Sequence, residues 1–197
     1  MNNPNAREKI LSTAVKIFAE KSFEGARIEE IAREAGVPKS LIYYHFKSKD
    51  ELLEVLTENF IEEYMTLIER GTNETHQEKA KRLSERMDQG YYEFGQRNAD
   101  LIRVMLIDSL KKTKEQPILF KVVEAMIAKE EEKKQGEEYD RQERRIAEFF
   151  TSLIPNYAYI CFGDAWSNYF NMNKSTFDKL YLEVYEETHG AYHKNHK

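Results

Sequence analysis

Residues 36–51 read GVPKSLIYYHFKSKDE, the pattern of a short helix with a boundary signal on either side. Gly36 can adopt the positive φ that ends a preceding helix, and Pro38 fixes the backbone for a new first turn. Ser48 and Glu51 match a capping box, in which two side chains satisfy the unpaired amides at the start of the next helix. The segment therefore predicts one short helix followed closely by another.

The short helix is expected to bury one face and expose the other. Ile42 and Phe46 lie four residues apart and can dock inward together. The outward residues carry ammonium, hydroxyl and imidazole groups: Lys39, Ser40, Tyr43, Tyr44 and His45. Such groups reach the phosphates and base edges of DNA, and lysines neutralise backbone charge. The alternative is a surface helix of ordinary composition.

The segment directly upstream favours the DNA-binding interpretation. Residues 28–37, IEEIAREAGV, have the pattern of a short amphipathic helix closed by a glycine. Two short helices joined by a tight turn with a glycine form the helix-turn-helix unit.

The spacing of these motifs resembles the N-terminal domain of TetR-family transcriptional regulators. The matching segments are FEG at 23–25, IA at 31–32, AGV at 35–37 and IYYHFKSK at 42–49. The resemblance covers roughly the first quarter of the chain, and beyond it only the length and the helical pattern are similar. The family usually places Thr or Ser before the helix that begins near Ile28, where this chain has Ala26 and Arg27. The capping hydroxyl is therefore missing, and Arg27 is a candidate to supply a phosphate contact in its place.

The resemblance implies an all-α protein with a helix-turn-helix DNA-binding domain over residues 1–50. A helical ligand-binding and dimerisation domain would follow over residues 51–197. It also implies a homodimer on a palindromic double-stranded DNA operator, and a repressor that a small-molecule effector releases. No enzymatic activity, cofactor or metal is expected.

The positions of the family's DNA contacts agree with the outward face described above. Phosphate contacts are assigned to Lys39, Tyr43, His45 and Lys49, in addition to Arg27. Base-edge contacts are assigned to Ser40, Leu41 and Tyr44.

Composition and charge fit a helical, DNA-binding chain. Hydrophobic residues make up 41%, enough for a core, and the eight glycines and four prolines are few. Residues 1–50 hold nine Lys and Arg against seven Asp and Glu, whereas the rest holds 21 against 28. A mildly basic module thus precedes an acidic body. Cys161 is the only cysteine, so no intramolecular disulfide can form.

The chain shows no signal for export or membrane insertion. The first residues are polar, and no apolar run approaches the roughly 20 residues that span a bilayer. We expect a soluble, cytoplasmic protein with no membrane partner.

Apolar periodicity predicts further helices along the chain. They cover about 6–21, 48–71, 77–96, 99–114, a segment from 118, 146–170 with an interruption at Pro155, and a last helix to about 188. Residues 129–145 are expected to be a helix end and a loop. The helix from Ser48 is long enough to link the DNA-binding module to the body.

The body is expected to hold a ligand pocket. Asp108 and Asp164 lie within apolar runs, where a carboxylate is costly to bury unless it is paired. Candidate pocket residues are Tyr64, Met87, Tyr91, Met105, Asp108, Phe120, Phe150, Tyr157, Asp164 and Trp166. The alternative is that both acids face solvent and the aromatic residues form an ordinary core. A bound ligand is expected to tilt the helix from Ser48 and so release DNA.

The last two helices are expected to form a two-fold homodimer, because Trp and Tyr are enriched at interfaces. Candidate interface residues are Phe162, Trp166, Tyr169, Tyr181, Val184 and Tyr185.

Two other classes of function remain as alternatives. His189, His193 and His196 have a helical spacing that suits a transition metal, although Gly190 and the terminal position favour a frayed tail. One Glu-x-x-His occurs at 186–189, whereas di-iron bundles need two. The catalytic serine and nucleotide-binding glycine motifs are missing, which argues against an enzyme. The third class is a structural DNA-associated protein without a ligand.

Overall fold

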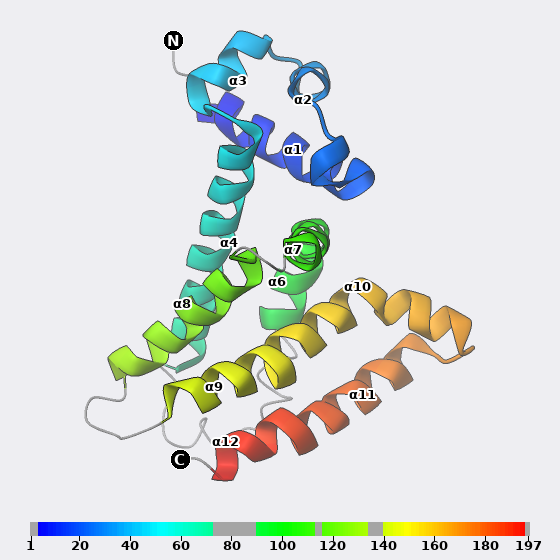
Figure 1. Cartoon of the computed structure of the whole chain (residues 1–197). Coiled ribbons are helices and arrows are strands. Elements are labelled where there is room, and N and C mark those ends of the chain that lie inside the picture. Colours follow the sequence, from blue (N-terminus) through cyan, green and yellow to red (C-terminus); the bar gives the residue numbers. More distant parts are fainter. Residues whose placement is uncertain (1–3, 73–89, 113–115, 134–139, 196–197) are drawn as a thin grey trace. The chain divides into compact units, whose positions relative to one another are not determined.

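The computed structural model of the chain describes residues 4–72, 90–112, 116–133 and 140–195 (Figure 1). Within these ranges the regular elements are all helices and no strand occurs, which confirms the all-α prediction. None of the helices in these ranges is both long and apolar enough to cross a bilayer.

The chain divides into two compact units. The first comprises Met1–Glu62 and Asp100–Leu119, and the second comprises Glu63–Ala99 and Phe120–Lys197. Helix α4 (Lys49–Thr72) runs without interruption from the first unit into the second. This division differs from the boundary expected at residue 50, because the start of α4 and a later helix both group with the N-terminal helices.

The first unit is built around the packing of its three N-terminal helices. It contains α1 (Pro4–Gly25), α2 (Ile28–Ala35), α3 (Lys39–His45), the start of α4, and α7 (Ala99–Lys111). Helices α1, α2 and α3 pack against one another (Figure 1). The side chains that they bury include Ile10, Ala14, Phe18, Ile31 and Ile42. These apolar residues hold α3 in place, as the helical periodicity predicted.

The end of α1 is irregular. Ser22 has φ 64° and ψ 162°, outside the helical region, close to the helix end predicted at residue 21. The chain then places Phe23 in the core, where its ring meets that of Phe18 edge-on at 5.3 Å between centroids. The break therefore lets a loop residue complete the hydrophobic core of the first unit.

Helix α7 is tied to this loop by two lysines. Lys111 Nζ lies 2.7 Å from Glu24 Oε2, and Lys112 Nζ lies 5.2 Å from the centroid of the Phe23 ring. The hydrogen bond from Lys111 lowers the pKa of Glu24 to about 2. Helix α7 thus belongs with the N-terminal helices by side-chain contact as well as by compactness.

The second unit contains the remaining helices. They are α6 (Tyr92–Arg97), most of α8 (Ile118–Lys133), α9 (Arg141–Ala147), η3 (Glu148–Leu153), α10 (Ile154–Tyr169), α11 (Lys174–Tyr185), η4 (Glu186–Gly190) and α12 (Ala191–Asn195). Helices α10 and α11 are connected by a short turn and lie side by side (Figure 1). Asn173 ends that turn, and its side chain accepts a hydrogen bond from Ser175 N at 2.9 Å.

One predicted loop is partly helical. The sequence suggested a helix end and a loop over 129–145, but α8 reaches Lys133 and α9 begins at Arg141. Asp140 starts α9 by accepting hydrogen bonds from Gln142 N at 2.8 Å and Glu143 N at 3.2 Å. An acidic N-cap therefore nucleates a helix inside a segment that its charge density made look like a loop.

The interruption predicted at Pro155 is present as a change of helix type. Residues Glu148–Leu153 form a π-helix, and Pro155 stands in the first turn of α10. Proline has no amide hydrogen to donate to the carbonyl four residues earlier, so the regular pattern cannot pass through it. Of the helix predicted over 77–96, residues 77–89 lie outside the described residues, and α6 occupies its end.

Candidate functional site

The turn between α2 and α3 has the geometry that a helix-turn-helix requires. Gly36 takes φ 62° and ψ 37°, in the left-handed region. The amides of Gly36 and Val37 donate to the carbonyls of Arg33 and Ala32, each at 3.0 Å. This pair of backbone hydrogen bonds is a Schellman motif, and a side chain at Gly36 would strain it.

Helix α3 has the two faces that its sequence predicted. Ile42 and Phe46 are buried, whereas Tyr43 and Tyr44 are 48% and 68% exposed. Lys39 and Ser40 are also exposed, and Leu41 and His45 are half-buried. The exposed face therefore presents an ammonium group, hydroxyl groups and aromatic rings on one short helix.

Lys39 is held at the start of this face by an acidic neighbour. Its Nζ pairs with Glu29 Oε1 of α2 and lies 5.5 Å from the centroid of the Tyr43 ring. The hydrogen bond with Glu29 raises the pKa of Lys39, and the same bond lowers the pKa of Glu29. Lys39 is therefore charged and is paired with a carboxylate on the neighbouring helix.

The predicted capping box joins the end of α3 to the start of α4. Glu51 N donates to Ser48 Oγ at 3.1 Å, as expected. The Glu51 carboxylate accepts from the amide of Lys47, one residue before the position that a capping box usually engages. The box thus orients α3 against α4 through two side-chain hydrogen bonds.

Lys49 has a different environment from Lys39. Its Nζ donates to the carbonyl oxygens of Phe23, Glu24 and Ala26 at 2.6, 3.3 and 3.1 Å. The ammonium group therefore caps the irregular end of α1 and is directed inward. Arg27 is exposed before α2 and makes no side-chain cap, in line with the missing hydroxyl.

Three of the predicted ligand residues lie in the interior of the second unit. The ring of Tyr64 meets that of Tyr91 at 6.0 Å and stacks on Phe94 at 5.6 Å. Burial raises the pKa of Tyr64, and the hydroxyls of Tyr91 and Tyr157 add to this effect. Burial likewise raises the pKa of Tyr157. Tyr157 is buried and Tyr64 and Tyr91 are half-buried, so the three residues form one aromatic cluster.

The other predicted ligand residues do not join this cluster. Phe120, Phe150, Asp164 and Trp166 are exposed, so for Asp164 the solvent-facing alternative describes the structure. Met105 and Asp108 are buried in α7, which belongs to the first unit. The Asp108 carboxylate lies 3.0 Å from Lys112 Nζ. Met87 lies outside the described residues.

Most of the predicted dimer residues line one groove. Helices α10 and α11 enclose a groove of about 870 Å³. Its lining includes Phe162, Trp166, Tyr169, Tyr181 and Val184. Tyr185, by contrast, is buried in the chain itself, with its hydroxyl 2.9 Å from Ser152 Oγ.

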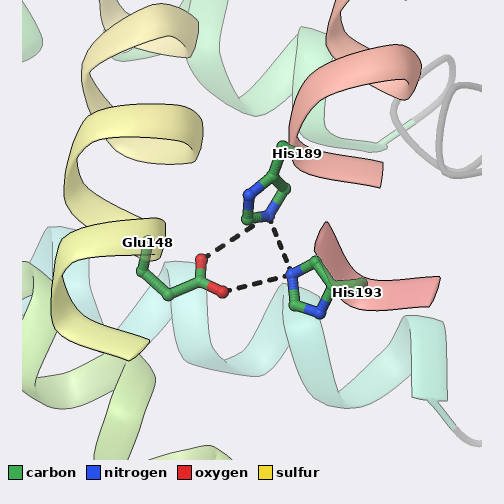
Figure 2. Close-up of side chains that lie close together, drawn as sticks. All are labelled: Glu148, His189 and His193. Atoms are coloured by element: carbon green, nitrogen blue, oxygen red, sulfur yellow. Dashed lines mark hydrogen bonds and ion pairs between the residues drawn. The ribbon is translucent and has the colours of Figure 1, made fainter. Parts of the chain in front are cut away.

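The end of the chain differs from the frayed tail that the sequence favoured. The last helix continues through η4 and α12 as far as Asn195. His189 is buried, and both His189 and His193 lie against Glu148 (Figure 2). The expectation of a frayed tail is therefore wrong for these two histidines, because a buried carboxylate from a distant helix anchors them. His196 lies outside the described residues.

The N-terminal part of the chain has relatives among known proteins. Residues 10–56 match the model for bacterial regulatory proteins of the tetR family. The N-terminal helices are therefore similar to the corresponding domain of tetR-family regulators. A 55-residue segment is 44% identical to YerO of Bacillus subtilis, described as an uncharacterized HTH-type transcriptional regulator. That segment is 28% of this chain and 19% of YerO. The match to YerO is therefore confined to a small part of that relative.

Solved structures of bacterial transcriptional regulators share the fold over most of the chain. A transcriptional regulator from Aquifex aeolicus has a TM-score of 0.62 at 22% identity, covering 91% of this chain and 96% of its own. FadR from Bacillus subtilis, solved in complex with stearoyl-CoA, has a TM-score of 0.58 at 17% identity, covering 90% and 96%. At these identities the similarity shows the fold alone.

Proposed function

We propose that this tetR-family chain is a DNA-binding transcriptional repressor that a small-molecule effector releases from its operator. The exposed face of α3 carries the proposal. It presents cationic, hydroxyl and aromatic groups from a helix that a Schellman turn and a capping box hold on both sides. A repressor of this kind acts by occupying its operator.

In the proposed complex α3 enters the major groove as the second helix of a helix-turn-helix. Lys39, Tyr43, His45 and Arg27 contact phosphates, which position the protein. Ser40, Leu41 and Tyr44 approach base edges, which supply sequence preference. Lys49 acts differently from the expectation of a direct phosphate contact. In this proposal it fixes the loop after α1, where it already has three carbonyl partners.

A homodimer completes the proposed DNA-binding unit. One short helix makes few contacts, whereas a dimer reads two half-sites about 34–36 Å apart on a palindromic operator. The groove between α10 and α11 supports this assembly, since it exposes several large apolar side chains on adjacent helices. Apolar patches of this kind on a soluble chain mark interaction sites.

The proposed effector acts through the second unit. The tyrosine cluster there supplies apolar faces and hydroxyl groups of the kind that line ligand pockets. A ligand shifts an equilibrium only by its different affinities for two states. Helix α4 is the covalent route for such a shift, because it belongs to both units. The stearoyl-CoA complex of FadR shows that a protein of this fold binds an acyl-CoA.

A gel-shift assay on the DNA upstream of the protein's own gene tests the proposal. A specific shift that competitor DNA of unrelated sequence does not remove supports a sequence-reading regulator. Compounds that raise the thermal stability of the protein are then added to the shifted complex. Release of DNA by one of them supports effector control, whereas a shift that none of them weakens supports a structural DNA-associated protein. The absence of any shift contradicts DNA recognition.

A further inference from the structure

Two π-helical turns meet in the second unit, and each carries a side chain with a metal-binding atom. Glu148 begins η3, and His189 lies in η4, which packs against η3. His193 follows four residues later in α12, on the same face as His189. Figure 2 shows the Glu148 carboxylate directed toward both imidazole rings. Single π-turns are frequent at functional sites because they redirect side chains.

The three groups are spaced like the ligands of one ion. His189 Nε2 and His193 Nε2 are 2.9 Å apart. Glu148 Oε1 is 3.2 Å from His193 Nε2, and Oε2 is 3.7 Å from His189 Nε2. Ligand bonds of about 2.0–2.1 Å in a tetrahedron separate neighbouring ligand atoms by roughly 3.3–3.4 Å. The three separations lie on both sides of that value, so an ion fits between them with small adjustments.

His189 already has the tautomer that a metal ligand needs. The Thr151 hydroxyl donates its only proton to the carbonyl of Ala147 at 2.7 Å. Because Thr151 Oγ1 lies 2.9 Å from His189 Nδ1, the ring nitrogen must be the donor in that contact. The lone pair of His189 is therefore on Nε2, which faces Glu148 and His193. A second-shell acceptor that orients a histidine in this way is typical of metal sites.

Burial strengthens this arrangement. Glu148 and His189 are only 4% and 3% exposed. A buried carboxylate beside two imidazoles offers one oxygen and two nitrogen donors, a combination that suits Zn²⁺ and similar ions.

Arg144 contacts the other nitrogen of the His193 ring. Its terminal nitrogen donates to His193 Nδ1 at 3.0 Å, which leaves the His193 proton on Nε2, directed at His189. An ion must take the place of that Nε2 proton. The His193 ring then carries its proton on Nδ1, and the Arg144 guanidinium turns away from it. The ring keeps one proton throughout, so the change is a tautomer shift.

We propose that Glu148, His189 and His193 bind a divalent transition-metal ion, with Zn²⁺ as the best match to the donor set and a water as the fourth ligand. The ion joins η3 to the C-terminal end of the chain through three side chains. This role is separate from DNA recognition and from the proposed effector.

Isothermal titration calorimetry of the full-length, chelator-treated protein with Zn²⁺ tests the site. We expect one ion per chain. Glu148→Gln or His189→Gln should weaken binding at least about a hundredfold, since each removes a ligand. His196→Gln is the matched control, because it removes an imidazole that is close in sequence but outside the proposed ligand set, and it should leave the affinity unchanged. Circular dichroism of each variant checks that the helical fold is retained.

Thr151→Val provides a second test that spares all three ligands. It removes the acceptor for His189 Nδ1 while keeping the side-chain volume, and should weaken Zn²⁺ about 10–100-fold. Substitution of Co²⁺ should give the visible absorption of a four-coordinate ion, lost in His189→Gln. The proposal is overturned if the wild type binds Zn²⁺ no more tightly than about 10 μM. It is also overturned if His196→Gln abolishes binding while His189→Gln does not, which would indicate chelation by the tail.

Discussion

Two surfaces of this molecule expose aromatic side chains, and they differ in what surrounds the rings. On α3, the exposed Tyr43 and Tyr44 stand beside Lys39 and Ser40. In the groove of α10 and α11, aromatic neighbours surround Tyr169, which is 83% exposed. A contiguous group of exposed rings indicates that a surface has a partner. Its neighbours indicate whether that partner is an anion or an apolar surface.

The hydroxyl groups of the two surfaces show the same contrast. In the groove, Tyr159 donates to Asp178 at 2.7 Å and Tyr181 donates to Asn156 at 2.8 Å. Their rings stack with centroids 4.2 Å apart, so both tyrosines offer ring surface while internal acceptors satisfy their polar ends. The shift of the Tyr181 pKa, raised mainly by burial, agrees with a hydroxyl withdrawn from solvent. The groove thus suits a second apolar face, in agreement with the proposed dimer.

The largest predicted effect comes from a charge in the groove. Val184→Glu places a carboxylate among aromatic rings, where a second copy would bury it without a partner. We expect monomers in sedimentation analysis at micromolar concentration. Loss of simultaneous binding to two half-sites should lower operator affinity by a factor of about 100 or more.

Lys179→Glu is the control for this substitution. Lys179 also belongs to α11 but is not among the residues that line the groove, and its side chain is 78% exposed. The Lys179→Glu variant should remain dimeric, although its change in charge is larger than that of Val184→Glu. A wild-type protein that is monomeric at micromolar concentration, or a dimer that survives Val184→Glu, would contradict the proposed interface.

Comparison of sequence and structure explains why one surface was easier to predict than other features. The boundaries of α3 are set within a few residues, by Gly36 before it and by the Ser48–Glu51 box after it. Local spacing then determines which side chains face outward. Local spacing gives no indication of which residues distant in sequence contact a side chain.

The partners of Lys49, Tyr185 and His189 could not be predicted from the sequence because they are distant along the chain. The carbonyls that bind Lys49 lie 23 to 26 residues away, and Tyr185 bonds to Ser152 33 residues away. His189 is anchored by Glu148, which no pattern near the C-terminus specifies. Helical periodicity records which face is apolar, but it does not record which buried polar group lies opposite.

The second predicted effect concerns base recognition. Tyr44 is the most exposed aromatic residue of α3 and is proposed to approach base edges. Tyr44→Ala should reduce affinity for the operator about tenfold, since a base contact contributes about 1–3 kcal/mol of discrimination. Affinity for DNA of unrelated sequence should change little. Fluorescence anisotropy with both DNAs measures the ratio of the two affinities. An equal loss of affinity for both DNAs would indicate that Tyr44 contacts phosphates.

The third prediction compares two lysines of the DNA-binding module. Lys39→Ala should weaken binding to every DNA sequence and lower the slope of log affinity against log salt by about one. Lys49→Ala should leave that slope nearly unchanged. It should instead lower the free energy of unfolding by about 1–3 kcal/mol, because three carbonyls lose a charged donor.

Anisotropy at several salt concentrations and urea unfolding separate these outcomes. Equal slopes for the two variants would show that Lys49 also meets the phosphate backbone. If Lys49→Ala lowered the salt slope by about one and left the free energy of unfolding unchanged, the result would support the direct phosphate contact expected from the sequence.

The smallest predicted effect tests the ion pair that occupies the proposed phosphate position. Glu29 holds Lys39 in the DNA-free protein, so phosphate binding must break this exposed pair. Exposed pairs contribute about 0.2–1 kcal/mol, and Glu29→Gln should therefore tighten DNA binding by a factor of roughly 1.4 to 5 at low salt.

The matched control and the double variant decide whether this gain depends on Lys39. Glu34→Gln removes another exposed acid of α2, one that pairs with Arg33 at 3.1 Å, and should produce a smaller gain. If Glu29 acts by occupying Lys39, the gain should disappear when Glu29→Gln is introduced into Lys39→Ala. An undiminished gain in that background would mean that Glu29 acts only through the general field of the module. The face of α3 would then lack the acid–lysine competition that the ion pair implies.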